Sequence, residues 1–160
     1  MSIRRKHDIN RDTGFTLVEV LVAVVVLAIG LLGLAGLQTF TLRNNQSAYY
    51  RSQATQLAYD IADRIRANFV EAGKLANSTY KTTTPGAFTA QGDCTTVTTT
   101  CTTSDMAKND LYEWNQELTN LPSGTGEIDV DAAGVFTVTV NWDDTRSGGP
   151  NTSFQMSFRP

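Results

Sequence analysis

The strongest constraint on this chain is an uninterrupted apolar stretch close to its amino terminus. The 18 residues from Val20 to Leu37 include no charged side chain. About 20 consecutive apolar residues cross the hydrocarbon core of a bilayer as a helix, so the stretch predicts one membrane-spanning helix. A single carboxylate, Glu19, stands immediately before it. An ionisable side chain at the edge of a membrane segment is costly, and this indicates a functional role.

A short polar segment precedes the apolar stretch. Residues 1–14 have no apolar core of their own and carry four basic side chains, Arg4, Arg5, Lys6 and Arg11. Basic residues that flank a membrane helix remain on the cytoplasmic side. We therefore expect the amino-terminal end in the cytoplasm and everything beyond Leu37 on the opposite side of the membrane.

Two ordinary interpretations of this region leave features unexplained. A secretory signal peptide has an apolar core of about 7–15 residues followed by a small-residue cleavage site. Here the core is longer, and only Ala35-Gly36 faintly resembles such a site. A plain single-span anchor accounts for the length and the flanking charge but gives Glu19 no role.

The residues around Glu19 favour a third interpretation. The motif Gly14-Phe15-Thr16-Leu17-Val18-Glu19, between a short basic leader and an apolar helix, resembles the processing site of type IV prepilins. The resemblance implies cleavage by prepilin peptidase between Gly14 and Phe15, N-methylation of Phe15, and retention of the apolar helix. It also implies an assembly role for Glu19, which would neutralise the methylated amino group of a neighbouring subunit.

Composition argues against several classes of protein. Of the 13 basic and 16 acidic side chains, the leader holds four and two, so the remaining chain has a formal charge of −5. This balance differs from the clustered Lys and Arg of nucleic-acid-binding proteins. The sole histidine, His7, lies in the leader, so the remaining chain cannot build a Ser-His-Asp, Cys-His or His-ligated metal site. We expect neither an enzyme nor a cofactor.

The apolar helix is expected to continue beyond the membrane stretch. Apolar side chains recur every three or four residues, as on one face of an amphipathic helix: Tyr50, Ala54, Leu57, Ile61, Ile65 and Phe69. No proline interrupts residues 1–84. We predict one helix of about 50 residues that ends before Gly73. Its 15–37 part would serve the membrane and assembly, with Gly30, Gly33 and Gly36 allowing close helix packing, and its 38–70 part would be amphipathic.

Residues 71–105 have the composition of a threonine-rich connection. They contain both cysteines, Cys94 and Cys101, with six residues between them. In an exported domain two cysteines at this spacing favour a local disulfide. A metal site would need further ligands, and the spacing differs from the C-x-x-C of redox-active pairs.

Residues 106–160 have the pattern of a small globular head. A short helix over Asp110–Leu118 precedes three segments of alternating polar and apolar residues, which predict an antiparallel meander: Glu127–Asp131, Val135–Trp142 and Phe154–Phe158. The amphipathic helix would cover the apolar face of this sheet. The predicted fold class is therefore α+β, a pilin fold with one long amino-terminal helix packed on a small antiparallel sheet.

Segments of this head are similar to the PilV-type minor pilins, the type IV pilus modification proteins. The segments are Asp110-Leu111, Trp114, Leu118, Leu121-Pro122 and Val138–Asp144. The resemblance implies a minor pilin that enters type IV pili and supports initiation of assembly, tip-complex formation, adhesion and twitching motility. The partners it implies are prepilin peptidase, other minor pilins, the major pilin and a tip adhesin. The location it implies is the inner membrane with the head in the periplasm, and then the pilus.

Two alternatives remain open. A minor pseudopilin of type II secretion or DNA uptake shares the amino-terminal chemistry. A membrane-anchored binding module, holding calcium through Asp143 and Asp144, belongs to another class, although an acidic pair in a turn is usually only solvated.

Overall fold

The computed structural model describes residues 14–94, 101–145 and 148–160. The leader residues 1–13, with their basic side chains and His7, lie outside the described residues, as do residues 95–100 of the threonine-rich connection. The chain divides into two compact units, Met1–Arg43 and Asn44–Pro160. Each unit is described by itself.

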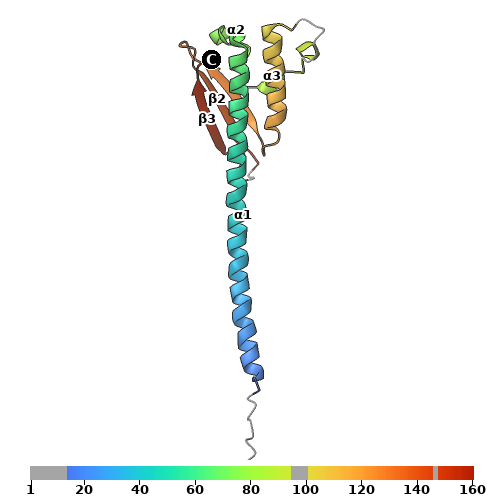
Figure 1. The fold of residues 1–160 in the computed structure, drawn as a ribbon, viewed down its shortest axis with the longest axis vertical. Helices are drawn as coiled ribbons and strands as arrows, with labels where there is room; N and C mark the ends of the chain where they lie inside the picture. The colour runs from blue at the N-terminus through green and yellow to red at the C-terminus, as the bar shows by residue number, and fades with distance from the viewer. Residues whose placement is uncertain (1–13, 95–100, 146–147) are drawn as a thin grey trace, which may run out of the picture. The chain divides into compact units, whose positions relative to one another are not determined.

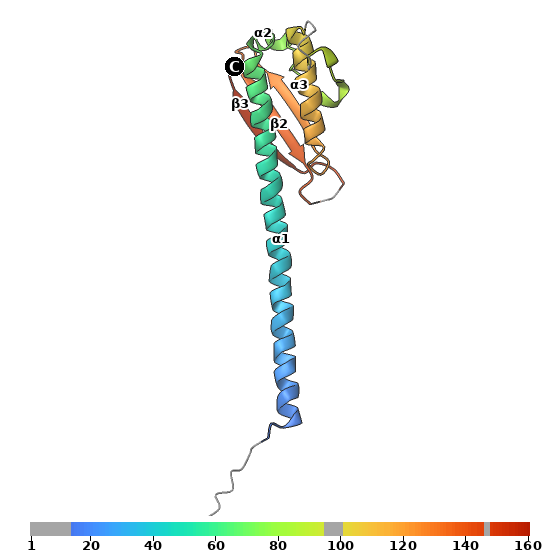
Figure 2. The same cartoon turned by 45° about the vertical axis from the view of Figure 1, so that its right-hand side comes forward.

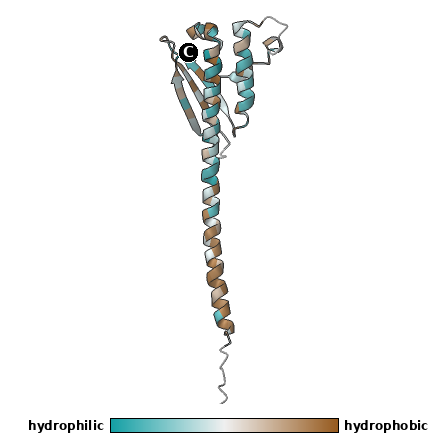
Figure 3. Cartoon of the chain, in the orientation of Figure 1, coloured by the Kyte–Doolittle hydropathy of each residue, from teal (hydrophilic) through white to brown (hydrophobic). Residues whose placement is uncertain are grey.

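Helix α1 spans Leu17–Ala67 and contributes residues to both units (Figure 1). The prediction of one long helix is confirmed. All described residues of the first unit are exposed, and the hydropathy colouring of Figure 3 shows how apolar this part of α1 is. In the described part of the chain, α1 is the one helix long and apolar enough to cross a membrane, judged by length and composition. A helix that is apolar on all sides needs lipid or other apolar helices around it.

The second unit contains a three-stranded antiparallel sheet. Its strands lie in the order β1-β2-β3, and they are β1 (Thr125–Val130), β2 (Phe136–Trp142) and β3 (Thr152–Phe158). Successive side chains of a strand point to opposite faces of the sheet. The register places Val138 of β2 between Ile128 and Met156, so the apolar side chains of all three strands share one face. The opposite face is polar, as in the hydroxyl pair Thr137–Ser157 at 3.0 Å.

Two helices cover the apolar face of the sheet. Figures 1 and 2 show that the part of α1 in this unit and helix α3 (Thr103–Leu118) lie along the same side of it. The core contains both tryptophans, Trp114 of α3 and Trp142 of β2. The indole nitrogen of Trp114 donates a hydrogen bond of 3.0 Å to the carbonyl of Leu57 in α1. The expected cover of the sheet by the amphipathic part of α1 is therefore present, and α3 shares it.

The long helix ends earlier than its apolar spacing predicts. A separate short helix, α2, occupies Phe69–Ala72. Phe69 consequently leaves the buried stripe, and 70% of it is exposed. Asn68 stands between the two helices, where its side-chain amide donates a hydrogen bond of 2.7 Å to the carbonyl of Thr103. Gly73 follows α2 as its C-cap, so it does not end the long helix as expected.

Helix α3 begins at Thr103, well before the predicted start at Asp110. The side chain of Thr102 caps this end, because its Oγ1 accepts a hydrogen bond of 3.1 Å from the backbone N–H of Asp105. An acidic residue in the first turn also complements the helix dipole. The first turns are mostly polar, with only Met106 and the buried Ala107 as apolar residues, so their composition resembles that of the preceding connection. Only the capping pattern marks the boundary.

Candidate functional site at the amino-terminal end of helix α1

The processing motif lies at the start of α1. Gly14, Phe15 and Thr16 precede the helix, and Glu19 belongs to its first turn. The Oγ1 of Thr16 accepts a hydrogen bond of 3.3 Å from the backbone N–H of Glu19. The backbone carbonyl of Thr16 accepts hydrogen bonds from the N–H groups of Glu19 and Val20. Thr16 therefore acts as the N-cap, a role that the sequence analysis missed although the T-x-x-E spacing of a capping box was present.

Glu19 is an acidic residue in the first turn of the helix. A negative charge at this position stabilises a helix by about 0.3–1 kcal/mol through the helix dipole. Among the residues that the structure describes, no Lys or Arg forms an ion pair with Glu19. Its carboxylate therefore remains available to a cation from another molecule.

The surroundings of Glu19 are apolar. Phe15 is 83% exposed. Together with Glu19 it lines a shallow groove along α1, whose other lining side chains are apolar: Val20, Ala23, Val24 and Leu27. Every side chain that lines this groove belongs to residues 15–27, so no other segment of the described chain covers it. A charge covered in such a place requires a compensating charge.

Gly30, Gly33 and Gly36 lie further along the same apolar segment. A Cβ built on any of them meets nothing within 4 Å. The fold of the chain itself therefore does not require glycine at these positions. Small residues on a membrane helix allow other helices to approach closely.

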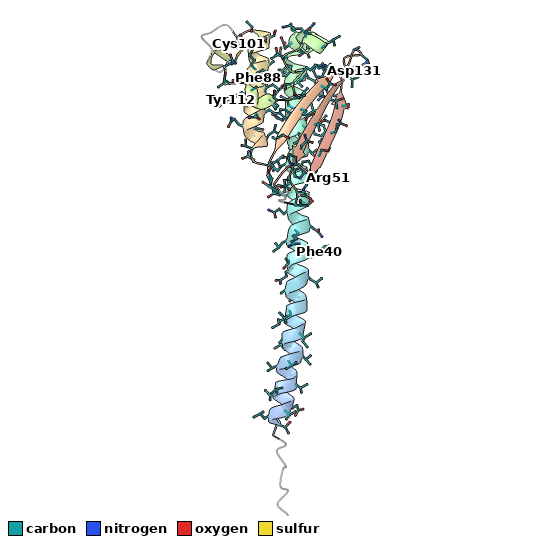
Figure 4. All side chains as sticks on the ribbon, turned by 180° about the vertical axis from the view of Figure 1, so that it is seen from behind. Phe40, Arg51, Phe88, Cys101, Tyr112 and Asp131 are labelled. Atoms are coloured by element: carbon teal, nitrogen blue, oxygen red, sulfur yellow. A yellow bond between two sulfur atoms is a disulfide. The ribbon has the colours of Figure 1, made fainter. Side chains whose placement is uncertain are left out.

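Polar side chains at the end of the apolar segment are satisfied within the helix. The hydroxyls of Thr39 and Thr41 donate hydrogen bonds of 3.0 Å to the carbonyls of Ala35 and Leu37. Phe40 lies between them in the sequence, and Figure 4 marks its place on α1. Hydroxyls bonded in this way are compatible with an apolar environment.

In the second unit, Cys94 and Cys101 form the predicted disulfide. Figure 4 shows Cys101 at the start of α3. The bond lies directly before Thr102, the cap of this helix. It therefore anchors the threonine-rich connection at the start of α3.

A buried carboxylate that the sequence analysis did not identify connects three segments of this unit. Glu71 of α2, 1% exposed, accepts hydrogen bonds from the N–H and hydroxyl of Thr79 at 2.9 and 2.8 Å, and from the hydroxyl of Thr103 at 3.2 Å. Lys74 donates a further bond of 2.5 Å. Burial raises the pKa of Glu71, but these bonds outweigh burial and lower the pKa to about 2. The carboxylate thus fixes the connection against α2 and α3.

Arg64 of α1 forms a second set of contacts with α3. Its Nε lies 2.8 Å from Asp60, and its Nη1 lies 2.5 Å from Glu113 and 3.5 Å from Asp110. Tyr80 donates a hydrogen bond of 2.5 Å to Asp110. Burial raises the pKa of the Asp110 carboxyl, whereas the hydrogen bond from Arg64 lowers the pKa of Glu113. Asp110 and Glu113 therefore hold α3 to Arg64 of α1, and Asp60, one turn before Arg64 in the same helix, holds the guanidinium in place.

Asp143 and Asp144 in the turn after β2 also have partners within the protein. Buried Asp143 accepts hydrogen bonds from the N–H of Gly148 at 2.8 Å and from the amide of Asn151 at 3.0 Å. Asp144 accepts one of 2.8 Å from the hydroxyl of Ser47. In the described residues, no group of three or more His, Cys, Asp or Glu side chains is placed to hold a metal ion. This geometry gives the calcium interpretation no support.

Comparisons with protein-family models match two adjacent stretches of the chain. Residues 9–35 match the prokaryotic N-terminal methylation motif, and residues 36–112 match the model described as type IV pilin Tt1218. The first match covers the processing motif and the apolar segment. The second covers the rest of α1, the disulfide and the first turns of α3. Searches among curated proteins and among solved structures found no match.

Proposed function

Because the chain is a type IV pilin with an amino-terminal methylation motif, we propose that it is a minor pilin of the PilV type. It enters type IV pili as a structural subunit and supports the initiation of assembly and formation of the tip complex. The segments around Trp114 and Trp142 that resemble this class support the proposal. Adhesion and twitching motility depend on this subunit through the pilus that it helps to build.

Processing prepares the protein for assembly. Prepilin peptidase cleaves between Gly14 and Phe15, and the new amino group of Phe15 is methylated. Gly14 is exposed directly before α1, so an enzyme can reach the bond without unfolding the helix. The retained apolar segment anchors the subunit in the inner membrane. The chain beyond Leu37, including the head, lies in the periplasm, and this orientation is supported by the basic residues of the leader.

Glu19 directs docking into the filament. The observation that carries this proposal is a carboxylate in an apolar groove with no cation partner among the described residues. The methylated amino group of Phe15 on a neighbouring subunit supplies that partner. Burial of either charge alone is strongly unfavourable, whereas burial of the pair is tolerated. Docking therefore favours subunits that bring both groups together.

The apolar surface of α1 supplies the remaining assembly energy. Side chains from Val20 to Leu37 are exposed in the single chain and are covered first by lipid and then by helices of other pilins. Gly30, Gly33 and Gly36 allow these helices to approach closely. Other minor pilins, the major pilin and a tip adhesin are the partners that we propose.

Processing and incorporation can be tested together. Intact-mass analysis of the wild-type protein should show loss of residues 1–14 and one added methyl group, and the processed form should occur in sheared pili. Gly14→Val should block cleavage and keep the protein in the membrane, whereas Gly14→Ala should be cleaved. Retention of the leader in the wild type would contradict the proposal. Recovery with components of a secretion system, and none in pili, would instead favour a pseudopilin.

A further inference from the structure

Strand β3 is an edge strand of the sheet. It pairs with β2 on one side only, and in Figure 1 it lies on the side of the sheet away from α3. Among the described residues, no backbone hydrogen bond joins β3 to any segment other than β2. The outer backbone groups of β3 are therefore free to bind another molecule.

The backbone hydrogen bonds of β1 identify which residues of β3 point outward. Ile128 of β1 exchanges two backbone bonds with Thr82, at 2.9 and 2.8 Å, on the side away from β2. In an antiparallel strand the N–H and C=O of one residue point to the same side, and opposite residues alternate between bonded and non-bonded pairs. Val138, opposite Ile128, consequently points its backbone groups toward β3 and bonds to Met156.

It follows that the alternate residues of β3 direct their backbone groups out of the sheet. These residues are Ser153, Gln155 and Ser157, whose side chains are exposed on the polar face. Each offers one N–H donor and one C=O acceptor at a spacing of two residues. Only an extended backbone repeats donors and acceptors at that spacing.

The two edge strands of the sheet differ in how well they are protected from pairing. The β1 margin is covered by Thr82 and carries Glu127 and Asp129, with Asp129 paired to Lys81 at 3.1 Å. Strand β3 contains neither a charged residue nor proline, and its register with β2 is regular over its whole length, without a bulge. Charges, prolines and bulges are the usual means by which proteins prevent pairing at an edge. Strand β3 therefore lacks these means of preventing pairing.

We propose that the outer edge of β3 binds an extended segment of a different pilus subunit, which adds a fourth strand to the sheet. The inference rests on the proposed function, since it requires neighbours in a filament. Phe154 and Met156 are half-buried at the rim of the core. The added strand therefore carries apolar side chains at alternate positions facing the helix-covered side, and its polar side chains face Ser153 and Gln155.

In antiparallel pairing, a second copy of this chain is a poor occupant of the edge. Two β3 strands paired antiparallel are related by a twofold axis normal to the sheet. Because α1 lies along the face of this sheet, the Asn44–Ala67 segments of two copies related by this axis would point in opposite directions. Both copies, however, must leave one membrane in the same direction.

A proline substitution tests the backbone bonds directly. Gln155→Pro removes an outward N–H and leaves the bonds between β2 and β3 in place, since proline is tolerated where the N–H of an edge strand faces solvent. Gln155→Thr keeps the N–H and is the matched control. In full-length protein, Gln155→Pro should lower the ratio of protein in sheared pili to protein in membranes by about threefold to tenfold. Gln155→Thr should match the wild type, and both should keep the wild-type thermal melt. Normal incorporation of Gln155→Pro would overturn the inference.

Cross-linking provides a second measurement that does not depend on proline. Ser153 and Thr125 both lie opposite Asn141, so they share one row at the two margins of the sheet. A maleimide–benzophenone reagent coupled to the new thiol and photoactivated in intact pili should link Ser153→Cys to a peptide of another pilin, and Thr125→Cys to none. The native cysteines are paired and do not react. No link at Ser153→Cys, equal links at both positions, or a link to a second copy of this chain would each overturn the proposal.

The unmodified protein serves as the control that distinguishes failure of the edge proposal from failure of the minor-pilin proposal. If the unmodified protein occurs in pili while the β3 variants behave like the wild type, the edge inference fails and the minor-pilin proposal stands. If the unmodified protein keeps its leader and is absent from pili, both fail.

Discussion

The hydroxyl of Thr16 accepts a hydrogen bond of 3.3 Å from the backbone N–H of Glu19. The proposed docking carboxylate therefore belongs to the residue that closes the N-terminal cap of α1. A change at Glu19 alters both the charge available for docking and the first turn of the helix. Variants of Thr16 separate these two effects because they disturb the cap and leave the carboxylate in place.

We predict that Glu19→Gln greatly reduces incorporation into pili and that Thr16→Val does not. Glu19→Gln keeps the backbone N–H that Thr16 binds but removes the charge, so the amino group of a neighbouring Phe15 would be buried without its partner. Such a loss costs about 3–5 kcal/mol. Thr16→Val removes only the cap, which is worth about 1 kcal/mol. The measurement is the ratio of protein in sheared pili to protein in membranes, and equal losses in the two variants would assign the effect to the helix start.

Glu19→Ala serves as a control for stability. Membrane insertion should be unchanged or slightly easier, because a charge has been removed from an apolar environment. The thermal melt of the head should not change, since the buried core begins at Ala54. Normal incorporation of this variant would leave helix packing at Gly30, Gly33 and Gly36 as the main determinant of docking.

The second prediction concerns the disulfide. Replacing Cys94 and Cys101 together by serine should lower the free energy of unfolding by about 2–3 kcal/mol, as expected for a short closed loop. The bond lies next to the cap of α3 at Thr102, so the first turn of α3 should become sensitive to proteases before the sheet does. Limited proteolysis with peptide mapping checks this order. First cleavage within β1–β3 would contradict it.

The helices and strands with a strong hydrophobic periodicity were predictable from the sequence. The uncharged run after Glu19 and the apolar spacing up to Ile65 indicated a single long helix, and three alternating segments indicated the meander. Hydrophobic periodicity decides these features locally. The disulfide also followed from two cysteines in an exported domain.

The remaining features depend on contacts between distant segments. The helix ends at Ala67 because Asn68 binds the carbonyl of Thr103, a residue 35 positions later in the chain. Glu71 in sequence is an ordinary charged residue near a helix end, yet the fold buries it and surrounds it with donors. No local pattern indicates such partners. The capping role of Thr16, in contrast, could have been found from the T-x-x-E spacing.

The third prediction tests the packing of α3 on the sheet. A Cβ on Gly126 of β1 would overlap the ring of Trp114 and would lie 2.8 Å from Cδ1 of Leu118. Overpacking in a core costs about 1–3 kcal/mol, so Gly126→Ala should lower the thermal melt measurably. Gly149→Ala is the matched control, because a Cβ there meets nothing within 4 Å. Equal melts for the two variants would show that Trp114 moves aside without cost.

The last prediction concerns the pH dependence of stability. The pKa of Glu71 is lowered from 4.5 to about 2 in the folded protein. A carboxyl with a lower pKa in the folded state adds stability that is fully present above the unfolded pKa and is lost as the pH falls through the folded pKa. For this buried side chain the contribution is at most about 3 kcal/mol. The free energy of unfolding should therefore decrease between about pH 4.5 and pH 2.

Glu71→Gln isolates this contribution. The variant should be less stable at neutral pH, because glutamine cannot accept all the bonds from Lys74, Thr79 and Thr103, and its stability should depend less on pH below about 4.5. Burial raises the pKa of Asp110, which gives the opposite pH dependence, but that group is present in both proteins and cancels in their difference. Urea denaturation of detergent-solubilised wild type and variant at about pH 5 and pH 3 gives the free energy of unfolding at each pH. The difference between the two pH values is the slope of stability against pH for each protein. Equal slopes would mean that Glu71 is not the group that links acid to unfolding. A smaller slope in the variant would identify the buried carboxylate as the acid-sensitive link between α2, the threonine-rich connection and α3.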